Sequence, residues 1–129
     1  MIEPVPLRFR NQFSENSKIF SLSDVFPEIG HNLLCSMTKS DFVYPIIIKR
    51  TSADEVIKAY YEILRETLED KEKLEIEVDD KDFSWKTLLY PTFLGDLMSI
   101  AFAEVHGVDA KEIPEVKFVK KWLRRVIHV

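Results

Sequence analysis

Two strand patterns separated by one helix pattern constrain the fold of this chain more than any other feature. Phe42–Ile48 is a nearly continuous apolar run, typical of a strand buried on both faces, and Leu74–Val78 alternates apolar and acidic residues. Between them, Ser52 and Glu55 have the spacing of a capping box, and apolar residues then recur at helical spacing to about Asp70. Strands that alternate with helices pair in parallel, so the sequence predicts an α/β fold.

The other elements are predicted from apolar spacing and from the positions of proline and glycine. The expected elements are a helix over residues 4–17, a short strand Ile19–Val25, a short helix Leu33–Met37, a long helix Ser84–His106 that ends at Gly107, and a last helix Pro114–Ile127. The long helix is apolar over much of its circumference, so we expect it to be largely buried or to form a subunit contact. Residues 1–129 are expected to form a single domain.

Composition and charge narrow the classes of function. A net charge of −4 argues against nucleic-acid binding, which needs clustered cations, and three glycines leave no phosphate-binding loop of the GxGxxG or GxxxxGK type. A single cysteine, Cys35, excludes an internal disulfide and fits a reducing compartment. No apolar run approaches the roughly 20 residues of a membrane helix, and Met1–Pro4 does not resemble a signal peptide. We therefore expect a cytoplasmic protein that binds no membrane, metal or cofactor.

Several short motifs, in order over about 120 residues, carry a resemblance to a known family. They are Glu3-Pro4-Val5 with Arg8-Phe9, Ser14-Glu15-Asn16-Ser17-Lys18, Val25-Phe26-Pro27-Glu28 followed by His31-Asn32, Leu94-Gly95-Asp96-Leu97-Met98-Ser99, and Gly107-Val108-Asp109 followed by Ile113-Pro114. With these motifs the chain resembles the C-terminal half of the bifunctional phosphoglucose/phosphomannose isomerases, which consist of two SIS (sugar isomerase) domains. The resemblance implies a three-layer, flavodoxin-like SIS domain with a short, truncated parallel sheet flanked by helices.

The resemblance also implies an activity and roles for three residues. The family interconverts glucose 6-phosphate or mannose 6-phosphate with fructose 6-phosphate through an enediolate, in carbohydrate metabolism. Glu15 matches the family's proton-transfer base, and His31, sixteen residues later, matches its ring-opening histidine. Lys120 matches a lysine that lines the substrate site, although Lys117 and Lys121 lie close enough to leave this register open. In the family the histidine comes from across a dimer interface, so the resemblance implies assembly.

Three departures from the family pattern limit what this chain is expected to do by itself. The family's glutamate after His-Asn is Leu33 here, and Gly30 stands where the family has asparagine. The chain is also expected to lack the strand before residue 4 and the first SIS domain, which carries the loops that bind the phosphate. We therefore expect an isolated chain to be a poor isomerase that needs a homodimer or a separate N-terminal SIS-domain chain. The alternative is a non-catalytic SIS-like module that binds a phosphosugar or a protein.

Each candidate residue also has an ordinary structural interpretation. A glutamate near a helix end is most often a solvated surface residue, and a histidine beside a glycine is most often a loop histidine. Lys120 belongs to a basic cluster near the end of the last predicted helix, where cations are favourable for reasons unrelated to a ligand. The functional interpretation of Glu15 and His31 depends on the resemblance and on their spacing.

Overall fold

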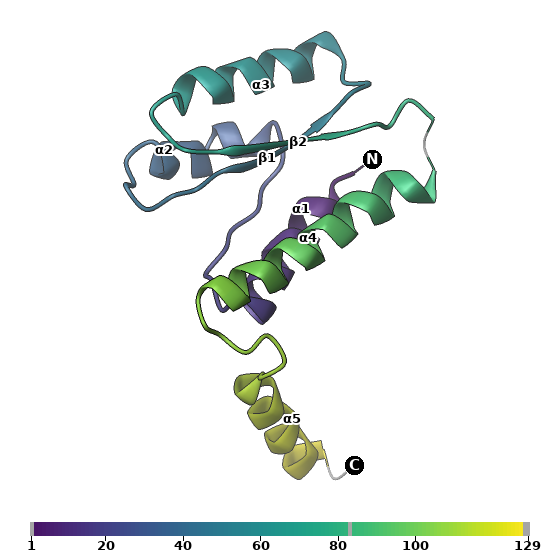
Figure 1. The fold of residues 1–129 in the computed structure, drawn as a ribbon. Helices are drawn as coiled ribbons and strands as arrows, with labels where there is room; N and C mark the ends of the chain where they lie inside the picture. Colours follow the sequence, from purple (N-terminus) through teal and green to yellow (C-terminus); the bar gives the residue numbers. More distant parts are fainter. Residues whose placement is uncertain (1, 83, 128–129) are drawn as a thin grey trace.

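The computed structural model describes residues 2–82 and 84–127, which form an α/β/α sandwich. Figure 1 shows α3 on one side of a small sheet, α1 and α4 on the other, and α5 extending from the body. The elements in chain order are α1 Pro4–Asn16, η1 Glu28–Gly30, α2 Leu33–Met37, β1 Ile46–Arg50, α3 Glu55–Thr67, β2 Leu74–Val78, α4 Trp85–Val105 and α5 Pro114–Ile127. This arrangement confirms the predicted three-layer fold with a short parallel sheet.

The sheet consists of β1 and β2, which pair in parallel from Ile46 opposite Leu74 to Arg50 opposite Val78. One face packs against α1 and α4 in a core that includes Phe9, Phe13 and Ile76, among other side chains. The opposite face packs against α2 and α3 in a second core formed by Ile47, Leu64 and Leu68. The side chains of adjacent residues in a strand point to opposite faces of the sheet, so Ile46 and Ile48 serve the first core and Ile47 serves the second.

The contact between α1 and α4 is built from small residues on α4 and aromatic residues on α1. The buried residues of α4 recur every four positions, which places them on one stripe of the helix: Thr87, Pro91, Gly95, Ser99 and Ala103. At Gly95 the helices approach so closely that an added Cβ would lie 2.7 Å from Cε2 of Phe9. The buried rings of Phe9 and Phe13 contribute about 1.5–3 kcal/mol each by removal from water.

Polar bonds fix the same contact in register. Gln12 Nε2 donates to Asp96 Oδ1, and the Arg8 guanidinium lies 3.5 Å from the same carboxylate. One turn further along, Ser99 Oγ accepts a hydrogen bond of 2.8 Å from Asn16. The Leu94–Ser99 motif is therefore a packing motif that holds the end of α1 against α4.

The predicted strand Ile19–Val25 is wrong. Residues 18–25 form an irregular segment with no ladder, and Phe20 is 88% exposed. A segment with alternating apolar and polar residues forms a strand only when a neighbouring strand pairs with it. This segment is separated from β1 by a cavity, so it does not pair.

Two other local predictions need correction. Strand β1 begins at Ile46 rather than Phe42, because Pro45 has no N–H to donate and joins the ladder only through its carbonyl, which accepts from Leu74. Helix α3 is capped by Asp54, whose side chain accepts from the Ile57 N–H at 2.9 Å, and the predicted capping box at Ser52 does not form.

The long helix α4 matches its predicted range, and it ends at Gly107 with a φ of +66° as expected. It is, however, not largely buried, because its small-residue stripe faces α1 while Phe93 and Leu97 are at least half exposed. By length and composition α4 could cross a membrane, contrary to the prediction, although Asp96 in its middle bonds to Gln12 of α1. Whether α4 forms a subunit contact stays a prediction.

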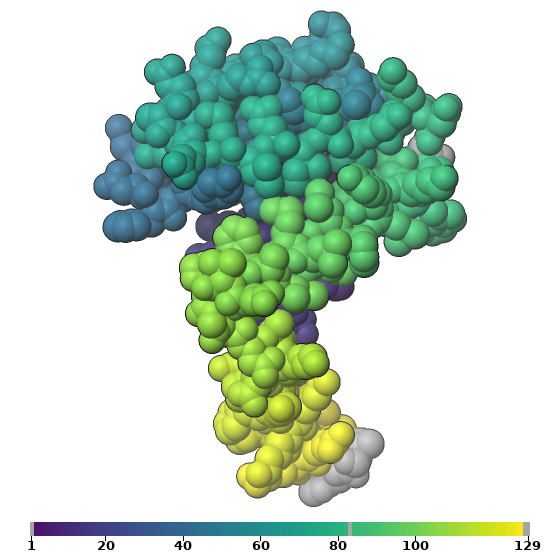
Figure 2. Space-filling view, viewed as in Figure 1, coloured from purple at the N-terminus to yellow at the C-terminus, as the bar shows by residue number. Residues whose placement is uncertain are grey.

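Helix α5 packs on nothing in the part of the chain that the structure describes. None of its residues is buried, and Figure 2 shows it projecting beyond the body of the domain. Its apolar side includes Phe118, Trp122 and Val126, each more than half exposed. A lone helix of this length is marginal in water, so we expect α5 to pack on a surface outside the described residues.

The substitution Gly95→Val tests the close approach of α1 and α4. The added side chain must displace the buried ring of Phe9, so we expect the free energy of unfolding to fall by about 2 kcal/mol. Ala101→Val, on an exposed position of the same helix, is the matched control and is expected to cost only about 0.5 kcal/mol through helix propensity. Urea unfolding measures both, and equal losses in the two variants would contradict the close contact.

Candidate functional site

Glu15 lies in the last turn of α1, and its side chain is exposed. The backbone around it is held firmly, because Ser17 is buried and its Oγ donates to the Ser99 carbonyl at 2.6 Å. Lys18 follows with a φ of +58°, and its Nζ donates to the Glu15 carbonyl oxygen at 2.6 Å. The end of α1 therefore presents the Glu15 carboxylate to solvent from a fixed backbone.

His31 lies between η1 and α2 and is also exposed. Its backbone N–H donates to the Glu28 carbonyl at 2.9 Å, which closes the short helical turn before it. The next residue, Asn32, caps α2 by accepting from the Leu33 N–H, and its Nδ2 donates to Glu28 Oε1 at 3.3 Å. The turn positions the imidazole at the surface.

Lys120 lies in the middle of α5, with Lys117 and Lys121 exposed beside it. The three predicted residues thus come from α1, from the start of α2 and from α5, which Figure 1 shows as separate parts of the molecule. No hydrogen bond or ion pair within the described residues joins Glu15, His31 and Lys120, and none of them lines the cavities.

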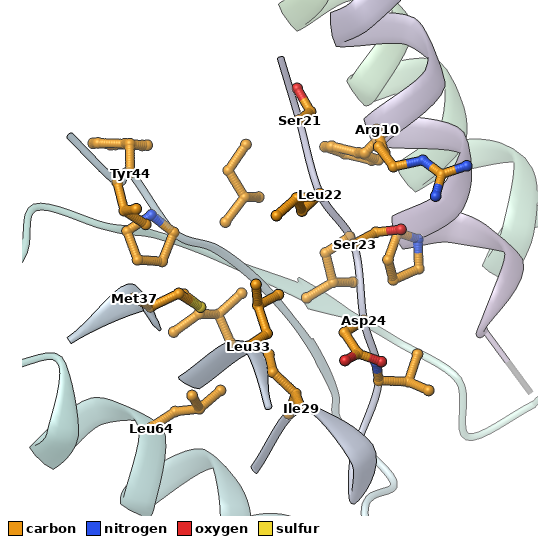
Figure 3. A pocket seen from close by; sticks show the side chains of 18 of the residues that line it. Arg10, Ser21, Leu22, Ser23, Asp24, Ile29, Leu33, Met37, Tyr44 and Leu64 are labelled. Carbon is orange, nitrogen blue, oxygen red and sulfur yellow. The ribbon is translucent and has the colours of Figure 1, made fainter. Parts of the chain in front are cut away.

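A cavity of about 910 Å³ lies beside the sheet between its two helical layers. Figure 3 shows the segment with Ser21, Leu22 and Asp24 along one side of this space, with Leu33 and Met37 of α2 across from it. The walls are mainly aliphatic and aromatic, and this cavity was not predicted from the sequence. The alternation of residues 19–25 did not indicate it, since Ser21, Ser23 and Asp24 line the cavity as well as the apolar residues of this segment.

The carboxyl ends of the two strands meet at a buried carboxylate. The side chain of Asp80, which follows β2, accepts from the backbone N–H of Ser52 at 2.9 Å and from Nε of Arg50 at 2.6 Å. Burial raises the pKa of Asp80, but these hydrogen bonds outweigh burial and lower the pKa to about 2.

This edge of a parallel sheet is where α/β proteins usually bind ligands. Here the Ser52 N–H, which could otherwise bind an anion, donates to Asp80 instead. The loop before α3 therefore has this donor already occupied by the protein's own carboxylate. The carboxylate was missed in the sequence analysis. The pairing of a Ser/Thr loop after one strand with acidic residues after the next strand could have indicated it.

Metal chemistry was not expected from the sequence. In residues 2–82 and 84–127, no three His, Cys, Asp or Glu side chains lie close enough together to hold a metal ion. The side chain of Cys35 is a free thiol and is exposed.

Comparisons with known proteins cover almost the whole chain. The model of the bacterial phospho-glucose isomerase C-terminal SIS domain matches residues 1–123. A bifunctional phosphoglucose/phosphomannose isomerase of Aquifex aeolicus is 26% identical over 123 residues, which are 92% of this chain and 38% of that protein. A protein of the same description from Thermoplasma acidophilum is 26% identical over 121 residues, covering 91% of this chain and 37% of its own length. The chain thus spans less than two fifths of the length of these relatives.

Asp80 gives the domain a defined sensitivity to acid. Because the pKa of Asp80 is lowered on folding, its stabilising contribution is fully present above about pH 4 and is lost as the pH falls toward 2. We expect Asp80→Asn to reduce the free energy of unfolding at pH 7 by about 2 kcal/mol, and the difference from the unmodified chain to vanish near pH 2.

Urea unfolding at pH 7, 5 and 3 measures this difference, with the exposed neighbour replaced in Asp79→Asn as the matched control. The pKa of Glu75 is also lowered to about 2, by hydrogen bonds from Arg65 and Lys49, so the unmodified chain and Asp80→Asn share an acid transition. Only the difference between them reports on Asp80. A difference that stays constant with pH would contradict the assignment.

Proposed function

We propose that this chain is one half of a sugar-phosphate isomerase. It belongs to the family of bacterial phosphoglucose isomerase C-terminal SIS domains. The reaction is the interconversion of glucose 6-phosphate or mannose 6-phosphate with fructose 6-phosphate, by analogy with relatives described as phosphoglucose/phosphomannose isomerases. A first SIS domain supplies the phosphate-binding half. A cytoplasmic location and a role in carbohydrate metabolism go with this proposal.

The fixed backbone at the end of α1 is the observation that supports the proposal most. The motifs of the family converge there, since Asn16 and Ser17 bond to Ser99 of the Leu94–Ser99 motif. This contact orients Glu15, which lies directly before them and stays exposed. A proton-transfer base needs both properties, because it must be held in place and must be reachable by the substrate.

In the proposed reaction the Glu15 carboxylate removes the proton from C2 of the open-chain aldose. The electron pair of the C–H bond forms the C1–C2 double bond of an enediolate, and negative charge develops on O1. Return of the proton from Glu15 to C1, with loss of the O2 proton and protonation of O1, gives the ketose. No oxidant or cofactor is required, since one carbon is reduced as its neighbour is oxidised.

His31 opens the sugar ring before this step, as its imidazole can move a proton between the ring oxygen and the C1 hydroxyl. Lys120, or its neighbour Lys117 or Lys121, supplies a cation for the substrate. The separation of Glu15, His31 and α5 in one chain agrees with a site formed between subunits, in which His31 of one chain faces Glu15 of another.

The alternative is a non-catalytic SIS-like module that binds a phosphosugar or a protein. It is favoured by Gly30 and Leu33, which replace polar residues of the family motif, and by Asp80, which occupies the donor at the carboxyl edge of the sheet. The two functions differ in the role of Glu15. Catalysis requires the Glu15 carboxylate for turnover, whereas a binding module does not.

The substitution Glu15→Gln separates the two functions. We expect fructose 6-phosphate to be converted to glucose 6-phosphate only when the chain is mixed with a first-SIS-domain chain from the same organism, and Glu15→Gln to lower this rate by at least about 100-fold. Glu66→Gln, an exposed glutamate on α3, is the control and is expected to have no effect.

A mixture without activity, or one in which Glu15→Gln changes nothing, would contradict the catalytic proposal. An NMR titration with fructose 6-phosphate then tests the alternative, the non-catalytic module. Shifts around Glu15 and His31 would indicate a phosphosugar-binding module, and their absence would favour a protein-interaction module.

The exposed apolar residues of α4 and α5 predict assembly. Leu89, Tyr90, Phe93 and Trp122 are each more than half exposed, which is more apolar surface on two helices than a monomer usually leaves in water. We expect a homodimer at micromolar concentration, and we expect Phe93→Glu to weaken it at least about tenfold by placing a charge in the contact. Thr67→Glu, at an exposed position of α3, is the control.

Sedimentation equilibrium measures the dissociation constant of each variant. The circular dichroism spectrum should be unchanged, because Phe93 is exposed and is not part of either core. A monodisperse monomer of the unmodified chain at micromolar concentration would contradict this prediction.

A further inference from the structure

Lys18 has a backbone conformation that lysine rarely adopts. Its φ is +58°, in the left-handed region, where the Cβ of an ordinary residue is crowded and glycine fits without strain. Helices commonly end with a glycine in this conformation, as α4 does at Gly107, whose φ is +66°. The end of α1 therefore carries a lysine at a position that suits glycine better.

The backbone on both sides of Lys18 is fixed. The Phe13 carbonyl accepts from the Ser17 N–H at 3.1 Å and from the Ile19 N–H at 3.2 Å. Ser17 is also buried, with its hydroxyl bonded to the Ser99 carbonyl. The neighbours thus hold the lysine in its strained conformation, and strain of this kind is concentrated at functional sites.

The Lys18 side chain turns back toward Glu15. Its Nζ donates to the Glu15 carbonyl oxygen at 2.6 Å, and the residue is exposed. Within residues 2–82 and 84–127, the ammonium forms no ion pair with the Glu15 carboxylate or with another carboxylate. The end of α1 therefore presents a carboxylate and an ammonium that do not neutralise each other. An anion that reached Glu15 would meet a cation beside it.

The enediolate of the proposed reaction is such an anion. When Glu15 removes the proton from C2, the carboxylate becomes neutral and negative charge develops on an oxygen atom next to the reacting carbons. A cation that is already in place stabilises this charge more than it stabilises the uncharged carbonyl of the sugar. Stabilisation of this kind lowers the barrier, because it is stronger in the transition state than in the bound substrate.

We propose that the Lys18 ammonium is a further residue of the substrate site, where it donates a hydrogen bond to the enediolate oxygen. This inference rests on the proposed function, because that reaction supplies the enediolate. The ordinary interpretation is that Lys18 only caps α1, since a lysine at a helix C-terminus bonds to free carbonyls and interacts favourably with the helix dipole. The two interpretations differ in what glycine does at this position.

The substitution Lys18→Gly distinguishes a cap from a site residue. Glycine relieves the backbone strain, so we expect the midpoint of urea unfolding to stay the same or to rise. Turnover of fructose 6-phosphate in the mixture with the first-SIS-domain chain should nevertheless fall at least about 100-fold in kcat, without a matching change in KM. Full turnover in Lys18→Gly would overturn the proposal, and so would a loss of turnover that follows a loss of stability.

Two further variants separate the charge from the shape of the side chain. Lys18→Met keeps the strain and the length but removes the cation, so we expect the same loss as in Lys18→Gly. Lys18→Arg keeps the cation and should remain within about tenfold of the unmodified chain. Lys58→Met, at an exposed position of α3, is the control and should have no effect. Equal rates of Lys18→Met and Lys18→Arg would overturn the proposal.

An added amine tests whether the missing group is the ammonium itself. Ethylammonium, at constant ionic strength, should raise the rate of Lys18→Gly at least about tenfold, because it supplies a cation in the space that the substitution leaves. It should not raise the rate of Lys18→Met, in which the methionine side chain fills that space. Equal responses of the two variants would overturn the proposal.

An NMR titration with fructose 6-phosphate keeps this inference distinct from the proposed function. In the mixture of chains, we expect the ε-methylene signals of Lys18 to shift and saturate, while those of Lys58 do not move. Saturating shifts at Lys18 without turnover in any mixture would contradict only the proposed function. Turnover that is lost in Glu15→Gln but retained in Lys18→Gly would contradict only this inference. The absence of both turnover and shifts would contradict both.

Discussion

The contact between α1 and α4 is the constraint on which the rest of the structure depends. Its closeness follows from one missing side chain, because Gly95 lets the ring of Phe9 approach to a distance that any Cβ would prevent. The polar bonds of Asp96 and Ser99 then fix the rotation of α1, and the buried aromatic rings attach α1 to the sheet. Glu15 receives its position from this contact without taking part in it. A change deep in the domain can therefore move the proposed base.

Local patterns were sufficient to predict most helices and the parallel pairing. The helical spacing between the two strand patterns indicated α3, and the short helix Leu33–Met37 and the C-terminal glycine of α4 were found where expected. These features depend on residues near one another in sequence, where periodicity and capping chemistry act. The layers follow from the same patterns, since a helix that alternates with parallel strands must cover one face of their sheet.

The errors in the sequence analysis arose where distant residues decide the outcome. Ser52 and Asp54 are both good capping residues, and Asp54 prevails in a structure where the Ser52 N–H is already bonded to Asp80, 28 residues away. The alternation in Ile19–Val25 predicted a strand, but alternation does not say whether a partner strand is present, and the segment is irregular in the structure. For the site, the resemblance identified Glu15 and His31, while their exposure and separation depend on the folded backbone.

The exposed features of this domain share a physical cause. Two helical layers cover both faces of a sheet of two strands, which leaves one edge of β1, the outward side of α4 and all of α5 without packing in the described chain. Each of these surfaces is unfavourable in water, because it exposes either unpaired backbone groups or apolar side chains. Assembly is the general way in which proteins cover such surfaces. Of the proposed site residues, Lys120 lies on one of these surfaces, on α5, while Glu15 and His31 are exposed elsewhere. A site divided between chains would then be formed only when the sheet edge and the helices are covered, so that folding, assembly and activity become one linked equilibrium.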